Sequence, residues 1–249
     1  MTTTIAADKG SSRLFIFAII GLLVAGALGI AFVANSRERL PDADPTAPVE
    51  VDGQSLLPMP QGITITDPSN DPNAGDVAPT LTGTTFTGEE VEIGPDGNPK
   101  AIYFLAHWCP HCAVEVPLVQ QLIDDGAVPD GIDLYAISTS YDATRGNPPH
   151  QWLHDEGFEP VTIRDDEGSS ALVAFAGTGF PYVVYLDGDN RVISRSSGSL
   201  DAETITNLWE NTATLGALST GAADLADDDI IEESDDAEDS AESEGEADS

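Results

Sequence analysis

The hydrophobic pattern divides the chain into one long apolar run, a polar segment, a series of short apolar stretches and a polar end. Residues 14–34, LFIFAIIGLLVAGALGIAFVA, are 21 uncharged and mostly apolar residues. A helix of that length spans roughly 30 Å, the thickness of the hydrocarbon core of a bilayer. The pattern predicts a single transmembrane helix from Leu14 to Ala34, after a tail of residues 1–13. A cleaved signal peptide is the alternative, although its apolar region is usually only about 7–15 residues long.

Two polar segments flank the rest of the sequence. Residues 35–75 are rich in Pro, Asp, Asn and Gly and lack regular apolar spacing, which predicts an extended linker. Residues 216–249 are of low complexity, with 14 acids and no cation between Asp224 and Asp248. Such a tail repels itself and is expected to be disordered. One folded domain is therefore expected over residues 76–215.

The apolar spacing within residues 76–215 predicts the order β-β-β-α-β-α-α-β-β-α. Two short strands around Thr87-Gly88 predict an N-terminal β-hairpin. The stretch KAIYFLAH, residues 100–107, is almost continuously apolar, as in a strand buried on both faces. Helical spacing follows at once in AVEVPLVQQLIDDG, residues 113–126, although Pro117 lies inside that segment. This order of strands and helices is typical of an α/β fold.

Charge excludes one class of partner. The chain has 44 acidic and 9 basic residues, for a formal net charge of −35. A surface of that sign repels the phosphate backbone, so nucleic-acid binding is not expected.

The only two cysteines lie in one short stretch, AHWCPHC, residues 106–112. A disulfide between Cys109 and Cys112 would close a four-residue ring and restrain little of the unfolded chain, so stabilisation is a poor reason for it. Two interpretations remain: a redox pair, or half of a metal site.

Each feature of this stretch suits thiol–disulfide exchange. Cys109 is placed where a buried strand passes into a helix, whose free N–H groups and partial positive charge favour a thiolate. Pro110 suits a first helical turn, and His111 can add an N–H donor or a cation. Cys112, one turn further along, is placed to attack a mixed disulfide on Cys109.

The metal interpretation has ligands available. His150 and His154 are four residues apart on a predicted helix and would complete a Cys2His2 zinc set. However, 37 residues separate Cys112 from His150, far more than in a zinc finger. The simpler interpretation places both histidines on the exposed face of a short helix, and we expect no metal. A further alternative is a binding module in which the two cysteines are incidental.

The segment FLAHWCPHCAVEVP, residues 104–117, resembles the active site of thioredoxin-fold proteins. It is most similar to the membrane-anchored TlpA/ResA-like thiol–disulfide oxidoreductases, and the resemblance spans about residues 75–215. Trp108 begins the W-C-x-x-C core, and Glu115 and Pro117 match the C-x-x-E-x-P helix pattern of that family. The segment FPYVVYLDGDNRVI resembles the part of the fold that carries a cis-proline, which implies that Pro181 lies opposite the cysteines. Gly198 matches the glycine after the last strand.

The resemblance implies a thioredoxin-like α/β fold, in which a central mixed sheet is flanked by helices. It also implies an extracytoplasmic thiol–disulfide oxidoreductase on a bacterial cell membrane. It implies a single membrane pass, with residues 1–13 in the cytoplasm. The substrates would be protein thiols and disulfides, and a membrane redox partner would reset the pair. The Cys109–Cys112 disulfide would be the only redox group, with no separate cofactor.

Three departures from the family pattern concern the site. Phe180 stands before the expected cis-proline, where the family often has threonine and where the substrate peptide is touched. Tyr103 occupies the strand position at which thioredoxin carries a buried acid, so Glu115 becomes the candidate for proton handling at Cys112. The Pro110-His111 dipeptide is the one found in DsbA, a strong oxidant.

Overall fold

The structure is a computed structural model that describes residues 40–59 and 71–228. The predicted transmembrane segment, Leu14 to Ala34, and the end of the acidic tail from residue 229 lie outside the described residues. Within the described ranges, no helix combines the length and the apolar character that crossing a bilayer requires.

Two sheets form the framework of the domain. The larger has five strands in the order β6-β5-β4-β7-β8, and the smaller has three in the order β1-β2-β3. In the larger sheet, β4 pairs in parallel with β5 and β5 with β6, whereas β7 is antiparallel to both β4 and β8. The strand bounds are β1 Glu50–Asp52, β2 Thr80–Thr84, β3 Glu90–Ile93, β4 Lys100–Leu105, β5 Asp133–Ser138, β6 Val161–Arg164, β7 Tyr182–Leu186 and β8 Val192–Ser197.

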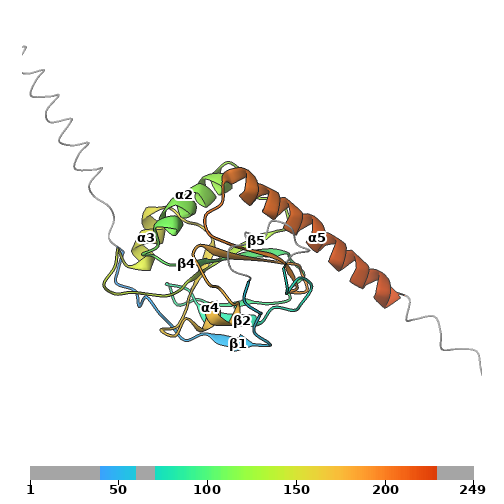
Figure 1. Cartoon of the computed structure of the whole chain (residues 1–249), viewed down its shortest axis with the longest axis horizontal. Coiled ribbons are helices and arrows are strands. Elements are labelled where there is room, and N and C mark those ends of the chain that lie inside the picture. The colour runs from blue at the N-terminus through green and yellow to red at the C-terminus, as the bar shows by residue number, and fades with distance from the viewer. Residues whose placement is uncertain (1–39, 60–70, 229–249) are drawn as a thin grey trace, which may run out of the picture. The chain divides into compact units, whose positions relative to one another are not determined.

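Helices cover both faces of the five-stranded sheet. Helices α2 (Pro110–Asp124), α3 (Pro149–Asp155) and α5 (Ala202–Asp228) lie on one side, and α4 (Ser170–Ala174) lies on the other with β1 and β2 (Figure 1). Parallel and antiparallel strands combined in this order, with helices on both faces, form the thioredoxin-like α/β arrangement that the sequence predicted.

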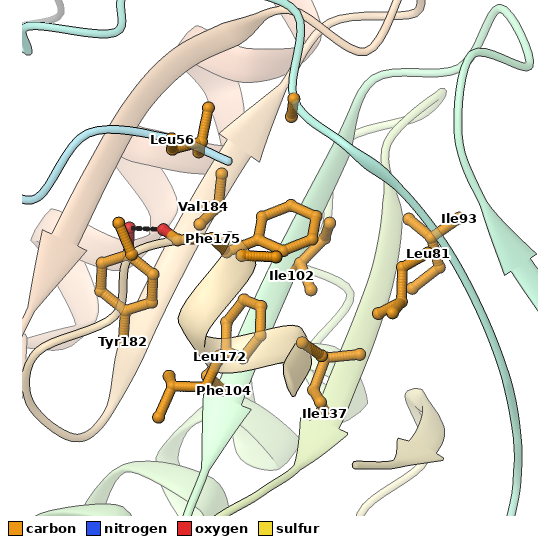
Figure 2. Close-up of a cluster of buried hydrophobic side chains, with 14 of the residues drawn as sticks. Leu56, Leu81, Ile93, Ile102, Phe104, Ile137, Leu172, Phe175, Tyr182 and Val184 are labelled. Carbon is orange, nitrogen blue, oxygen red and sulfur yellow. Dashed lines mark hydrogen bonds between the residues drawn. The ribbon is translucent and has the colours of Figure 1, made fainter. Parts of the chain in front are cut away.

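The central strand β4 divides the core into two clusters. All six of its residues are buried, as its continuous apolar run predicted. Ile102 and Phe104 face the cluster under α4 and the small sheet, which Figure 2 shows together with the hydrogen bond from the Tyr182 hydroxyl to the Phe175 carbonyl. Ala101, Tyr103 and Leu105 face the opposite cluster, under α2 and α5. Side chains alternate in this way because successive residues of a strand point to opposite faces.

The segment predicted as a linker is part of the folded domain where the structure describes it. β1 pairs with β2, and Leu56 and Met59 are buried in the core under α4. Asp71 makes a two-point ion pair with the fully buried Arg195, with both N–O distances at 2.7 Å. The linker interpretation is therefore wrong for β1, Leu56, Met59 and Asp71, because each of them has a specific partner in the folded domain.

Three further predictions need correction. Strand β6 was missed because its four residues are too few to show a periodic pattern. It is defined as a strand by its pairing with β5. Helix α5 continues to Asp228, so the acidic tail expected from residue 216 begins as helix. His150 is buried and packs against the ring of Phe86 at 5.9 Å, whereas His154 is exposed as predicted.

Candidate active site

The loop between β4 and α2 places Cys109 at the start of a helix. The Cys109 N–H donates to the Ala106 carbonyl at 2.9 Å, and Cys109 is the N-cap residue of α2. Pro110 occupies the first helical position, where its missing N–H costs nothing because that group would have no helical partner. Pro110 and His111 are exposed. The positive end of the helix dipole is thus directed at the Cys109 sulfur.

The two thiols differ in access. Both are free, and Cys112 is completely buried, whereas Cys109 retains 7% of its surface. Burial raises the pKa of the Cys112 thiol strongly, and proximity to Cys109 and to Glu115 raises it further. An incoming disulfide can therefore reach only the Cys109 sulfur, while Cys112 is held as a protonated thiol behind it.

The segment before β7 lies against Cys109. The Phe180–Pro181 peptide bond is cis, as the family resemblance implied, and the Phe180 carbonyl oxygen is 3.8 Å from the Cys109 sulfur. Gly198, which follows β8 with a φ of 92°, donates its N–H to the Pro181 carbonyl at 2.8 Å. The sequence segments carrying the cysteines and Pro181 therefore meet at one end of the sheet.

Trp108 joins the cysteine loop to two other parts of the site. Its indole N–H donates to the Ser140 carbonyl at 2.7 Å, and its ring meets the Phe180 ring edge-on at 5.8 Å. The guanidinium of Arg145 lies over the indole, 4.9 Å from the ring centroid. The loop after β5, residues 139–148, is thus held beside the cysteines by Trp108.

His107 also holds the loop after β5, residues 139–148, through hydrogen bonds. Its Nδ1 is 2.9 Å from the Asn147 carbonyl, and its Nε2 accepts the Asp142 N–H at 3.3 Å. These two contacts need a neutral ring with the proton on Nδ1. Burial lowers the pKa of His107, in keeping with a neutral ring. His107 therefore fixes the loop after β5 through two of its backbone groups.

A groove opens beside Trp108. Its volume is about 720 Å³, and its walls come from the loop after β5, the start of α4 and the N-terminal segment. The lining residues are Thr46, Trp108, Ser140, Tyr141, Asp142, Ala143, Thr144, Arg145, Glu167 and Ser169. Sequence reasoning missed this wall. Its only sequence signal was a polar connection of ten residues after a buried strand, longer than the usual connection in an α/β unit.

Glu115 lies one turn after Cys112 and is almost fully buried, at 1% exposure. Its Oε2 accepts the Leu200 N–H at 2.8 Å, and its Oε1 has no partner among the described residues. Burial raises the pKa of Glu115 to about 7, although the hydrogen bond from Leu200 opposes this shift. A carboxyl group that titrates near neutrality beside a buried thiol can exchange a proton with it.

The four residues of the zinc alternative are not assembled. Across residues 40–59 and 71–228, no three side chains of His, Cys, Asp or Glu are grouped so that they could hold a metal ion. His150 instead packs on the ring of Phe86.

No protein-family model matches this sequence. The chain is 29% identical over 113 residues to the thiol:disulfide interchange protein HelX of Rhodobacter capsulatus, a match that covers 45% of this chain and 58% of HelX. The chain thus spans less than two thirds of that relative.

Solved structures with a similar fold include a thiol:disulfide interchange protein of the thioredoxin family from Chlorobium tepidum and StoA from Bacillus subtilis. The first has 19% identity and a TM-score of 0.47, covering 55% of this chain and 95% of its own. StoA has 18% identity and a TM-score of 0.45, covering 55% and 98%.

Replacing the buried acid should change how stability depends on pH. The pKa of Glu115 is higher in the folded chain, at about 7, than its ordinary value of 4.5. Its contribution to stability is therefore complete below pH 4.5 and is lost as the pH rises to 7. In urea unfolding of the full chain, the free energy of unfolding of Glu115→Gln should rise relative to that of the native chain. The rise between pH 5 and pH 8 should be roughly 2–3 kcal/mol.

Glu203→Gln, on an exposed position of α5, is the matched control for removing one negative charge. If the Glu115→Gln and native curves stay parallel from pH 5 to pH 8, Glu115 is not a buried acid in solution.

Proposed function

We propose that this chain is a thiol–disulfide oxidoreductase that acts on protein substrates through Cys109 and Cys112. The observation that carries the proposal is the arrangement of the two thiols at the start of α2. One sulfur is partly accessible and faces the Phe180 carbonyl, and the other is fully buried behind it. The similarity to HelX, a thiol:disulfide interchange protein by name, supports the same activity.

The chemistry follows from this order of access. In the reducing direction, the Cys109 thiolate attacks one sulfur of a substrate disulfide, and the other substrate sulfur leaves as a thiolate. Cys112 then loses its proton to Glu115 and attacks the Cys109 sulfur, which releases the second substrate thiolate. The substrate gains two electrons, and Cys109 and Cys112 become a disulfide. The oxidising direction is the reverse of these steps.

The substrate is a polypeptide rather than a small disulfide alone. A peptide bound at Cys109 would pass the Phe180 carbonyl, and the groove beside Trp108 offers room for the residues that flank the reacting cysteine. No nucleic acid is expected to bind, because of the net charge of −35. No metal or separate cofactor is needed, since the disulfide itself carries the electrons.

We further propose that residues 14–34 tether the domain to a bacterial membrane, with residues 1–13 in the cytoplasm and the active site outside it. The length and apolar character of this segment and the likeness to TlpA/ResA-like proteins support the proposal. A membrane redox partner would then return the Cys109–Cys112 pair to its working state.

Trapping tests the activity. Cys112→Ala removes the resolving thiol, so the mixed disulfide on Cys109 should persist and its partner can be identified by mass spectrometry. Cys109→Ala should trap nothing, because its remaining thiol is fully buried. Equal trapping by the two variants would refute the assigned roles. No trapping, together with no reduction of insulin by the native chain, would favour a binding module.

The direction of the reaction can be measured. The Pro110-His111 dipeptide between the cysteines is the one found in DsbA, a strong oxidant, which supports an oxidising pair here. Equilibration with glutathione buffers should give a potential more oxidising than that of thioredoxin, which is about −270 mV. His111→Pro should shift it towards the thioredoxin value. A native potential at or below about −270 mV would make the protein a reductant.

Reporter fusions test the topology. Alkaline phosphatase, which is active only after export, should be active when fused after residue 220, and a cytoplasmic reporter at the same place should be inactive. The opposite result would place the active site in the cytoplasm.

A further inference from the structure

Three hydroxyl side chains lie on the face of the five-stranded sheet that α2 and α5 cover. Tyr103 of β4 pairs with Val183 of β7, which pairs in turn with Ser196 of β8. Paired residues share a face, and so do residues two apart on one strand, which adds Tyr185. Tyr103 and Tyr185 are members of the apolar cluster that contains Cys112. A group of buried hydroxyls next to a buried thiol is unusual in a core of this kind.

The hydrogen bonds of this group are incomplete. The Trp209 indole of α5 donates to the Tyr103 hydroxyl at 2.9 Å. An indole N–H can only donate, so the Tyr103 O–H remains available to donate elsewhere. The Tyr185 hydroxyl interacts electrostatically with the Tyr103 and Ser196 hydroxyls. Even so, the Tyr185 hydroxyl, the Ser196 hydroxyl and Glu115 Oε1 are all buried and none makes a hydrogen bond of regular geometry with any residue that the structure describes. Buried polar groups normally have partners, so three such atoms under the same two helices need an explanation.

Glu115 is electrostatically coupled to both phenols. Burial raises the pKa of Tyr103 and of Tyr185, and the nearby Glu115 carboxylate raises both further. Glu115 interacts electrostatically with Cys112 of its own helix, with Tyr103 of β4 and with Tyr185 of β7, and it accepts the Leu200 N–H after β8. The buried Glu115 carboxyl group therefore lies within electrostatic range of both phenol hydroxyls, and its free oxygen has no other partner among the described residues.

We propose that Tyr185, assisted by Tyr103, is a positioning residue that binds the free Glu115 oxygen, directly or through one bridging water, and so lets Glu115 exchange a proton with Cys112. The inference rests on the proposed thiol–disulfide exchange. A phenol suits this role because its O–H can donate to a carboxylate and its oxygen can accept from a carboxylic acid. Both protonation states of Glu115 therefore keep a partner, although the site excludes bulk water.

The proton transfer belongs to the resolving step. Cys112 gives its proton to Glu115, and its sulfur attacks Cys109. The bond from Cys109 to the substrate sulfur breaks, and the substrate leaves as a thiolate that takes a proton from solvent. Ionised Glu115 is the form that accepts the proton, and a hydrogen bond to a charged acceptor is stronger than one to a neutral group. Loss of the Tyr185 hydroxyl should therefore disfavour the ionised form.

The test uses the full chain with glutathione bound to Cys109 as a preformed mixed disulfide. Tyr185→Phe should move the pH midpoint of glutathione release upward by about one unit, which slows release about tenfold at pH 6. Tyr103→Phe should move the midpoint in the same direction. Tyr182→Phe, on the same strand but facing the opposite cluster, is the matched control and should leave it unchanged. In a Glu115→Gln background, Tyr185→Phe should have no further effect on the pH profile.

A second measurement separates this inference from the proposed function. The Glu115 carboxyl can be titrated by carbon-13 NMR without any thiol reaction, and its midpoint should rise in Tyr185→Phe and stay unchanged in Tyr182→Phe. If the carboxyl shift appears but glutathione is not released, the hydroxyl contact is correct and the proposed exchange fails. If the Glu115 midpoint is the same in the native chain and in Tyr185→Phe, the inference is overturned.

Discussion

The packing of the first turns of α2 on the five-stranded sheet is the constraint on which the site depends. Cys112, Glu115, Val116 and Val119 are all buried there, so the helix cannot rotate without exposing apolar surface. Because the helix is fixed, Cys109 stays at its N-terminus, facing the Phe180 carbonyl, and Cys112 stays behind it. The difference in access between the two sulfurs is therefore a result of helix packing rather than of the loop sequence alone.

The same packing buries polar groups, which lowers the free energy of unfolding. A carboxyl group and several hydroxyls are buried in a cluster that is otherwise apolar, and an unpartnered buried polar atom typically costs about 1–3 kcal/mol. An apolar residue at position 115 would avoid that cost. Residues that lower the stability of a fold tend to lie at functional sites. The buried carboxyl group of Glu115 fits this rule if it serves the chemistry of Cys112.

Features encoded by local pattern could be predicted from the sequence, and features that depend on distant partners could not. The apolar run of β4, the passage into α2 and the pairing of β7 with β8 follow from spacing and turn residues. Strands β1 and β6 have three and four residues, too few for periodicity to appear, and each is defined by its neighbouring strand. His150 was expected to be exposed because helix spacing alone does not reveal Phe86, which comes from a loop far away in the sequence.

The candidate site shows the same division. The motif around Trp108 and the resemblance of the Phe180–Pro181 segment predicted the two parts of the chain that meet at Cys109. The groove wall was not predictable, because it depends on Trp108 donating to a carbonyl 32 residues further along the chain. Tyr185 could not be singled out for a similar reason. Within an apolar strand its ring resembles any core residue, and only the packing of α2 on the sheet brings it within electrostatic range of Glu115.

The ion pair of Asp71 with Arg195 has a consequence for where the domain can be cut. The pair joins residues 124 positions apart, and both side chains are fully buried. A fragment that starts at residue 76 would keep the guanidinium in the core without its carboxylate, and breaking a buried pair in this way costs about 3–5 kcal/mol. That is a large part of the total stability of a domain, about 5–15 kcal/mol. The Arg164 guanidinium also donates to the Asp44 carbonyl, and the Ala47 N–H donates to the Asp165 carbonyl. The folded unit therefore extends back at least to Asp44, about thirty residues before the start at residue 76 that the hydrophobic pattern indicates.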